Sequence, residues 1–232
     1  MKHTKRILTA IAVSMIILTA CGASNDPSGS KAESVISSSS KSGTSESQNN
    51  SEQSSKNDNT KKSLVVYFST PEITDATTTA SQVFINGKVY GTTEYMAHVI
   101  HENTDSDLFR IELEEPYGSD VPDRAKNEQD NGILPKLSSH IEKLDSYDKI
   151  YVGYPTWWYD MPQVMYSFFD EYDFSGKTII PFNSHGGSQF SGSIEKITKL
   201  EPNANVITDG MTLPRENVAE SEEKIIEWVK QF

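Results

Sequence analysis

The sequence predicts an α/β domain in which helices cover both faces of a parallel sheet. Three short runs are continuously apolar, which is typical of strands buried on both faces; they span residues 64–68, 149–153 and 178–182. A fourth run, residues 107–113, alternates between polar and apolar side chains and so predicts a strand at the edge of the sheet. Segments with helical spacing separate these runs, and strands that alternate with helices indicate βαβ units in three layers.

Four segments between or after these strands carry apolar residues at helical spacing. In one of them, Met161, Met165 and Phe168 recur after Asp160, a candidate helix cap, and Pro162, which suits a first helical turn. The last segment closes the chain, with its large apolar residues on one side. We therefore expect helices over residues 161–172, 133–144, 193–200 and 218–232.

The first residues of the chain resemble an export signal. The basic residues Lys2, Lys5 and Arg6 precede an apolar run, residues 7–18, that is too short for a comfortable membrane-spanning helix. The sequence Leu18-Thr19-Ala20-Cys21 resembles the lipobox of bacterial lipoproteins, which implies cleavage before Cys21 and acylation of its sulfur. The alternative is an uncleaved N-terminal anchor with a buried thiol. On either interpretation the chain is exported; the first anchors it by lipid to the outer side of the bacterial cytoplasmic membrane.

Composition divides the exported chain into a tether and one domain. Residues 22–62 are rich in Ser and Asn and include no aromatic residue. Such a segment cannot bury enough apolar surface to offset the entropy of ordering. We therefore expect a signal peptide over residues 1–20, a lipidated cysteine and disordered tether over residues 21–62, and a folded domain over residues 63–232. Cys21 is the only cysteine, so no disulfide is available to that domain.

The charge of the chain limits its partners. The formal net charge is −12, and loss of the signal peptide leaves 18 basic against 33 acidic residues, a net charge of −15. The tether has as many lysines as acidic residues, so the excess negative charge belongs to the domain. Such a domain repels nucleic acid and anionic lipid. We therefore expect no nucleic-acid partner, and membrane attachment through the lipid anchor only.

Unusual side chains follow the three buried strands, at the sheet edge where open parallel sheets bind ligands. Ser69 and Thr70 offer hydroxyl groups after the first strand. The second loop offers flat aromatic faces, and the third offers glycines that let a ligand approach the backbone closely. Together the loops predict a site for a ligand with an anionic end and a planar aromatic end, formed by Pro155, Thr156, Trp157 and Trp158 and by Ser184, His185, Gly186, Gly187 and Ser188.

From residue 63 onward the chain resembles the flavodoxins, and more specifically the flavodoxin-like FMN proteins of bacteria. The most specific match is Gly153-Tyr154-Pro155-Thr156-Trp157-Trp158 followed by Asp160-Met161-Pro162, supported by residues 172–177 and 184–188. The resemblance implies a flavodoxin-like three-layer sandwich with a five-stranded parallel sheet in the order 2-1-3-4-5. It also implies one FMN, bound noncovalently where the strand order reverses.

The phosphate loop departs from the usual pattern of that family, in which the first strand runs through Ser/Thr-x-Thr-Gly-Asn-Thr directly into a helix. Here the strand ends at Ser69, and the best match to the second half, Gly91-Thr92-Thr93, comes about twenty residues later. Between them, residues 83–90 predict a β-hairpin insertion, because Asn-Gly suits a two-residue turn. We expect the insertion to return Ser69 and Thr70 beside Gly91, Thr92 and Thr93, where hydroxyls and helix amides would bind phosphate. The alternative is that the two threonines only cap a helix.

Single residues of the other two loops have competing interpretations. We expect at least one of Trp157 and Trp158 to lie near the flavin ring, although aromatic residues after a strand more often belong to a core. His185 is expected at the site, as a donor to the flavin or as the catalytic proton source. Its alternative role is that of a loop residue held by local hydrogen bonds, while Gly186 and Gly187 contact the flavin through their amides.

The functional prediction is redox chemistry with bound FMN, in one of two forms. A one-electron shuttle would dock a redox partner protein through its acidic rim, whereas a reductase would pass electrons to a small-molecule acceptor. Arg124 and Arg215 are expected on the solvated surface, with recognition of an NAD(P)H phosphate as the alternative. Export favours a membrane-bound electron donor, because NAD(P)H is not expected outside the cell. A third possibility is a flavodoxin-shaped surface module that binds a peptide, glycan or protein and has lost FMN.

Overall fold

The computed structural model describes residues 62–70, 82–118 and 121–232, so the predicted signal peptide, Cys21 and nearly all of the predicted tether lie outside the described residues. The main sheet begins at its edge with β4 (Ser106–Arg110), followed by β1 (Lys62–Tyr67), β5 (Tyr147–Pro155) and β6 (Thr178–His185). Two short strands, β7 (Asn205–Val206) and β8 (Met211–Pro214), pair with the start and the end of β6 and share the fifth position.

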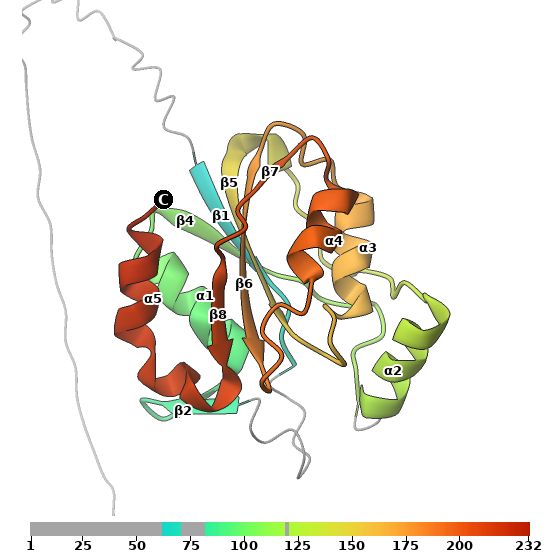
Figure 1. Ribbon diagram of the computed structural model, residues 1–232, viewed down its shortest axis with the longest axis horizontal. Coiled ribbons are helices and arrows are strands. Elements are labelled where there is room, and N and C mark those ends of the chain that lie inside the picture. Colours follow the sequence, from blue (N-terminus) through green and yellow to red (C-terminus); the bar gives the residue numbers. More distant parts are fainter. Residues whose placement is uncertain (1–61, 71–81, 119–120) are drawn as a thin grey trace, which may run out of the picture. The chain divides into compact units, whose positions relative to one another are not determined.

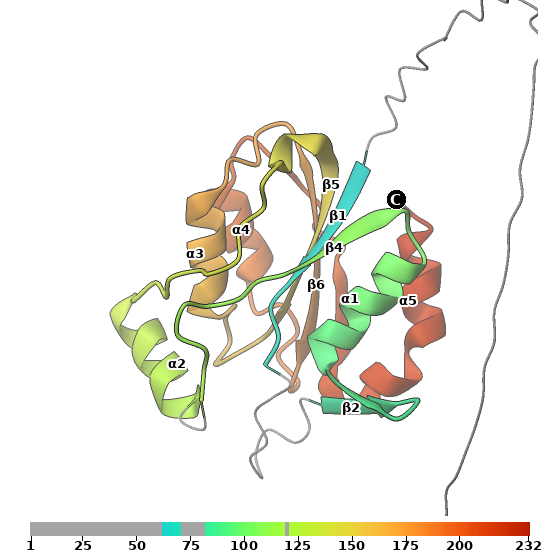
Figure 2. The same ribbon diagram turned by 180° about the vertical axis from the view of Figure 1, so that it is seen from behind.

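Every pairing in the main sheet is parallel, so the predicted order 2-1-3-4-5 and the edge position of the alternating strand are confirmed. Helices α1 (Thr92–Glu102) and α5 (Glu222–Val229) cover one face of the sheet. On the other face lie α3 (Gln163–Glu171) and α4 (Ser193–Leu200), with α2 (Val121–Asn131) beside α3 (Figures 1 and 2). The predicted three-layer architecture is therefore present.

The central strands divide their side chains between two cores, one on each face of the sheet. In β1, Leu64 and Val66 belong to the core beneath α3, whereas Val65 and Tyr67 belong to the core beneath α1 and α5. All four side chains are at most 4% exposed. Burial on both faces explains why the strand sequence is continuously apolar.

The predicted β-hairpin lies between β1 and α1. Strands β2 (Gln82–Ile85) and β3 (Lys88–Gly91) pair antiparallel. The two turn residues, Asn86 and Gly87, have φ angles of 51° and 82°, the left-handed conformation that a two-residue hairpin turn requires. The hairpin ends at Gly91, directly before α1, and so precedes the helix N-terminus that the sequence assigns to phosphate.

The prediction of a helix over residues 133–144 is wrong. Its backbone pairs instead with residues 112–114: the Ser138 N–H donates to the Glu112 carbonyl at 2.9 Å, and the Glu114 N–H donates to the Lys136 carbonyl at 3.0 Å. Pro135 also lacks the N–H that a helix interior needs. The helix of this region is α2, which the sequence analysis missed because only two of its apolar residues are buried.

The other helices differ from prediction at their ends. Helix α4 is confirmed, and α3 begins at Gln163 with Pro162 at the N-cap. Asp160 does not cap α3; its carboxylate accepts hydrogen bonds from the Met161 N–H and the Tyr166 hydroxyl. The C-terminal segment is a 3₁₀ helix, η3 (Arg215–Glu220), followed by α5, in place of one helix over residues 218–232. In the part of the chain that the structure describes, no helix has the length and apolarity needed to cross a membrane.

Candidate functional site

A small crevice lies at the carboxyl ends of β5 and β6, and we call it the strand-end crevice. Its volume is about 30 Å³, and most of the residues that line it were predicted from sequence. They are Thr92, Pro155, Thr156, Trp157, Ser184, His185, Gly186 and, from outside the prediction, Arg215. Residues far apart in the sequence thus meet here because parallel strands end at the same edge of the sheet.

Three buried hydroxyl groups converge at the N-terminus of α1. Ser184, at the end of β6, shares hydrogen bonds of 2.9 Å with the hydroxyls of Thr92 and Thr93. All three residues are at most 3% exposed. The N–H of Gly91, one residue before the helix, donates to the Glu94 carboxylate at 2.9 Å. The helix terminus thus offers hydroxyl donors and partial positive charge, but one of its amides is already used by the chain's own carboxylate.

The loop after β5 is a tight aromatic turn. Trp157 and Asp160 exchange backbone hydrogen bonds of 2.8 and 2.9 Å across it. The two residues between them, Trp158 and Tyr159, have φ angles of 43° and 65°. This left-handed conformation is strained for bulky side chains, and such strain is typical of functional sites. Asp160, the last residue of the turn, forms an ion pair of 2.5 Å with Lys196 and so ties the turn to α4.

Trp157 and Trp158 have different surroundings. The Trp157 ring packs edge-on against Phe68 and Tyr117, with ring centroids 5.7 and 5.6 Å away. Trp158 is 41% exposed and Tyr159 is 76% exposed. Of these aromatic residues, only Trp157 lines the strand-end crevice and forms a wall of it.

His185 is buried beside the crevice and is held in one tautomer. Its Nδ1 accepts a hydrogen bond from the Gly187 N–H at 2.8 Å, so in the neutral ring the proton lies on Nε2. Burial lowers the pKa of His185, and the nearby Glu216 carboxylate opposes that shift. The side chain is therefore a neutral Nε2–H donor at pH 7.

The lowered pKa of His185 predicts a pH dependence of stability. The unfolded state binds the proton near the ordinary pKa of about 6.5, whereas the folded state resists it. The contribution is therefore fully present above that pH and is lost as the pH falls toward the folded value. We expect the free energy of unfolding of His185→Gln to fall less steeply below pH 6.5 than that of the wild type, as measured by urea denaturation. Equal slopes for the two proteins would contradict this. Burial also lowers the pKa of His98, so the change of slope measured for His98→Gln is the reference with which the change for His185→Gln is compared.

Asn183 joins two of the loops and was missed by the sequence analysis. It is fully buried in β6, and its Nδ2 donates to the Thr156 hydroxyl at 2.6 Å and to the Gln189 carbonyl at 3.0 Å. The Thr156 hydroxyl in turn donates to the same carbonyl at 2.8 Å. These bonds fix the loop after β5 against the loop after β6. A polar residue at the end of a buried strand was the available signal.

Several predicted residues lie outside the strand-end crevice. Ser69 and Thr70 line a cavity of about 310 Å³ beyond β1 and β4, together with Phe68, Arg110 and Tyr117. Ser188 lines another cavity, of about 420 Å³, above α4. Among the described residues, no hydrogen bond joins Ser69 or Thr70 to Gly91, Thr92 or Thr93, and their return to the helix N-terminus stays a prediction. Gly91, Thr93, Gly187 and Trp158 do not line the crevice either.

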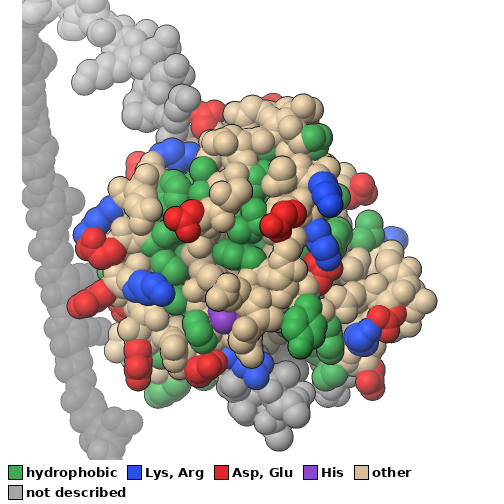
Figure 3. Space-filling model, in the orientation of Figure 1, with side chains coloured by type: hydrophobic (Ala, Val, Ile, Leu, Met, Phe, Trp, Pro, Cys, Tyr) green, Lys and Arg blue, Asp and Glu red, His purple; other side chains and the backbone are tan. Residues whose placement is uncertain are grey.

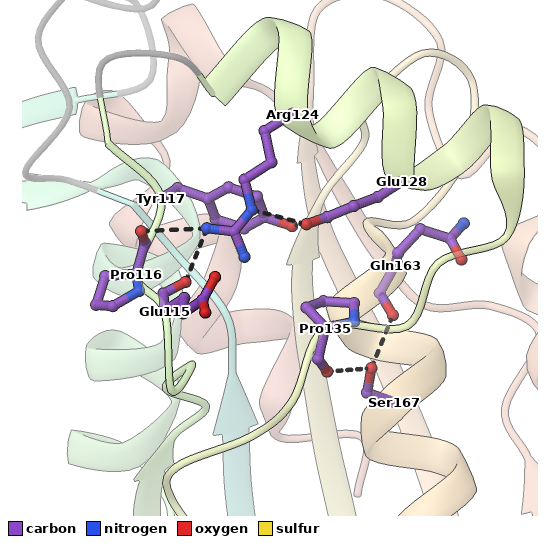
Figure 4. Close-up of polar contacts among 8 residues, drawn as sticks. All are labelled: Glu115, Pro116, Tyr117, Arg124, Glu128, Pro135, Gln163 and Ser167. Carbon is purple, nitrogen blue, oxygen red and sulfur yellow. Dashed lines mark hydrogen bonds and ion pairs between the residues drawn. The ribbon is translucent and has the colours of Figure 1, made fainter.

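Trp157 stands between the strand-end crevice and the Ser69 cavity. It lines the first, and its ring contacts Phe68 and Tyr117, which line the second. Tyr117 is fixed from α2: its hydroxyl donates to the buried Glu128 carboxylate, and the Arg124 guanidinium stacks on its ring at 4.5 Å (Figure 4). Burial raises the pKa of Tyr117, and Glu128 raises it further.

The two arginines do not lie where the sequence placed them. Arg124 is no freely solvated side chain, since its Nε donates to Glu128 at 2.9 Å and its Nη1 donates to the carbonyls of Glu115 and Pro116. Arg215 lines the strand-end crevice and is half-buried. Within residues 62–70, 82–118 and 121–232, no cluster of histidine, cysteine or carboxylate side chains could hold a metal ion.

Comparison with known proteins gives one family and a set of similar structures. The family model described as flavodoxin matches residues 83–232. A candidate flavoprotein from Bacteroides eggerthii DSM 20697 is 27% identical, with a TM-score of 0.58 over 73% of this chain and 96% of that one. A second, from Bacteroides uniformis ATCC 8492, is 28% identical, with a TM-score of 0.57 over 73% and 98%. A flavoprotein from Lactobacillus acidophilus NCFM in complex with FMN is 21% identical, with a TM-score of 0.48 over 69% and 97%. No curated protein matches the chain.

Proposed function

Because the chain belongs to the flavodoxin family, we propose that it binds FMN at the strand-end crevice and functions in electron transfer or flavin-dependent reduction. The observation that carries this proposal is the meeting of Thr92, Thr93 and Ser184 at the start of α1, with Trp157 in the same crevice. Hydroxyl donors at a helix N-terminus suit a phosphate group, and a tryptophan wall suits a flat aromatic ring.

The donor set fits FMN, but the crevice is smaller than the ligand. A volume of about 30 Å³ has room for about two water molecules. We therefore expect the aromatic turn to move outward on binding. The strained backbone of Trp158 and Tyr159 and the left-handed Gln189 and Ser191 of the facing loop identify the segments that would move.

Four residues of the crevice have a task in this proposal. Thr92 and Ser184 would hold the phosphate, with the Thr93 hydroxyl bonded to Ser184, and Trp157 would exclude water from one side of the ring. His185 would donate its Nε2–H to an acceptor atom at the pyrimidine end of the flavin, and its lowered pKa keeps it a neutral donor at pH 7. When bound, FMN supplies the capacity to accept and release electrons, which no side chain of the crevice has.

The choice between a shuttle and a reductase is part of the proposal, and so is the cellular location. We favour a protein anchored by the lipid on Cys21 outside the cytoplasmic membrane, which takes electrons from a membrane-bound donor. Transient docking of a basic redox partner is consistent with the net charge of −15 that remains after loss of the signal peptide. On the face seen in Figure 3, acidic side chains are scattered among basic ones and do not form a single patch. The small-molecule acceptor therefore remains the second form of the proposal.

FMN binding has a direct test with the full chain. We expect the wild type to quench FMN fluorescence in a saturable titration. Thr92→Val removes the threonine hydroxyl of the cluster that lines the crevice, at nearly constant volume, and we expect it to weaken FMN binding about 10-fold, the loss typical of one hydrogen bond to a charged group. Thr212→Val is the matched control, because this hydroxyl on β8 has no partner and does not line the crevice.

The control variant should bind FMN as the wild type does. A wild type that leaves FMN fluorescence unchanged would contradict the proposal and favour a surface module that binds another ligand. Quenching that is equally strong in Thr92→Val would keep FMN binding but remove the hydroxyl cluster from the site. Anaerobic titration of the FMN-loaded chain with a quinone and with a one-electron donor would then separate the reductase from the shuttle.

A further inference from the structure

Arg215 has an unusual position for a charged side chain in this domain. It follows Pro214, the last residue of β8, which pairs with His185 at the end of β6. Its guanidinium lies against Gly186, where a Cβ would be 3.5 Å from the Cζ atom. The side chain is half-buried and lines the strand-end crevice together with Thr92 and Ser184.

Within the described parts of the chain, Arg215 forms no ion pair and donates no hydrogen bond. Arg124, the other arginine discussed above, forms an ion pair and donates to two carbonyls. A half-buried guanidinium without a partner costs desolvation energy that nothing in the protein returns. No carboxylate lines the crevice. In a chain with a net charge of −12, the arrangement indicates that the partner of Arg215 is an external anion.

The hydroxyl cluster identifies which anion this is. Thr92 and Ser184 line the crevice with Arg215, at the positively polarised end of α1. One amide of that helix terminus, the Gly91 N–H, is taken by Glu94. A phosphate at this end therefore has one amide donor fewer, and a guanidinium offers two parallel N–H groups in its place.

We propose that Arg215 binds the phosphate group of FMN and gives the site its preference for FMN over riboflavin. The inference rests on the proposed function and adds a cationic ligand to it. It predicts that the contribution of Arg215 appears only with the phosphorylated flavin. It also predicts that FMN affinity falls with rising salt concentration more steeply than riboflavin affinity does.

The test is a pair of fluorescence titrations of the full chain, one with FMN and one with riboflavin. For Arg215→Met we expect FMN binding to weaken about 10- to 100-fold, the range for a lost hydrogen bond to a charged group, with riboflavin binding unchanged. Arg215→Lys should fall between the wild type and Arg215→Met, because it keeps the charge but not the paired donors. Lys126→Met is the control for net charge, since Lys126 pairs with Asp130 on the exposed side of α2.

The outcomes separate this inference from the proposed function. A wild type that binds neither flavin overturns both. A wild type that binds FMN, with equal losses for FMN and riboflavin in Arg215→Met or with no loss at all, overturns the role of Arg215 alone. Far-ultraviolet circular dichroism checks the fold of each variant. If Arg215→Met does not fold, the ratio of FMN affinity to riboflavin affinity is measured in Arg215→Lys and Arg215→Gln instead. A ratio unchanged from the wild type in both variants overturns the inference.

Discussion

Replacement of Gly153 by alanine is expected to lower the free energy of unfolding by about 3 kcal/mol. Gly153 lies in β5 directly beside Phe182 of β6, and a Cβ at this position would come within 2.1, 2.3 and 2.8 Å of three atoms of the Phe182 ring. That ring is fully buried and cannot swing into solvent. Overpacking of this severity lies at the upper end of the usual cost in protein cores. Urea denaturation monitored by tryptophan fluorescence measures the change.

A second substitution distinguishes overpacking from a general loss at this position. Phe182→Leu removes the ring atoms that a Cβ would meet, so the double variant Gly153→Ala/Phe182→Leu should be more stable than the sum of the single changes implies. Gly186→Ala is the matched glycine control, because a Cβ there would be 3.5 Å from its nearest neighbour, an ordinary contact. Strict additivity of the two changes would contradict the steric explanation.

The sheet could be predicted from the sequence because a strand that is buried on both faces has a continuously apolar sequence. Residues 64–68 cannot alternate when one set of side chains faces α3 and the other faces α1 and α5. The hairpin was equally accessible, since few pairs other than Asn-Gly adopt its turn without strain. In both cases the local sequence and the tertiary structure impose the same requirement.

The failed helix at residues 133–144 shows where such agreement ends. Ile133 and Leu137 have helical spacing, but their environments differ: Leu137 is buried against Leu113, whereas Ile133 is 46% exposed. The spacing of apolar residues does not show what surrounds each of them. Residues with unrelated surroundings can therefore produce the pattern of one helical face. Helix α2 has the opposite property, because its position depends on the polar side chains of Arg124 and Glu128, which are expected at a solvated surface.

The candidate site was predictable to the extent that it lies on strand ends. The loops after β5 and β6 meet because parallel strands share one edge, which the sequence pattern already implied. Arg215 was expected at the solvated surface because η3 reaches the crevice only through the pairing of β8 with the end of β6. The short strands β7 and β8 left little signal in the sequence, so the fifth position of the sheet was assigned without its residues. The place of Ser69 and Thr70 beside Gly91, Thr92 and Thr93 stays a prediction, because the residues after Thr70 depart from the continuous loop of the family.

Arg124 supplies the second large effect. We expect Arg124→Met to lower the free energy of unfolding by about 2 to 3 kcal/mol, because the Glu128 carboxylate, 5% exposed, would lose its ion pair and remain buried. The figure lies below the usual cost of breaking a buried pair because the Arg124 side chain is 24% exposed and partly screened by water. Urea denaturation at pH 7 measures the loss. Lys126→Met removes the exposed ion pair between Lys126 and Asp130 on the same helix and should cost less than about 0.5 kcal/mol.

The same substitution has a consequence for the site, because Arg124 and Glu128 hold Tyr117 and Tyr117 packs on Trp157 (Figure 4). If the aromatic wall depends on this support, Arg124→Met weakens the binding of FMN and of riboflavin by the same factor. Arg215→Met, in contrast, should weaken only the binding of FMN. The double variant Arg124→Met/Glu128→Met removes the stranded carboxylate and should recover part of the lost stability. If the double variant recovers stability but not flavin binding, the effect on binding lies in the orientation of Tyr117. If Arg124→Met is as stable as Lys126→Met, the claim that the buried Arg124–Glu128 pair stabilises the fold is wrong.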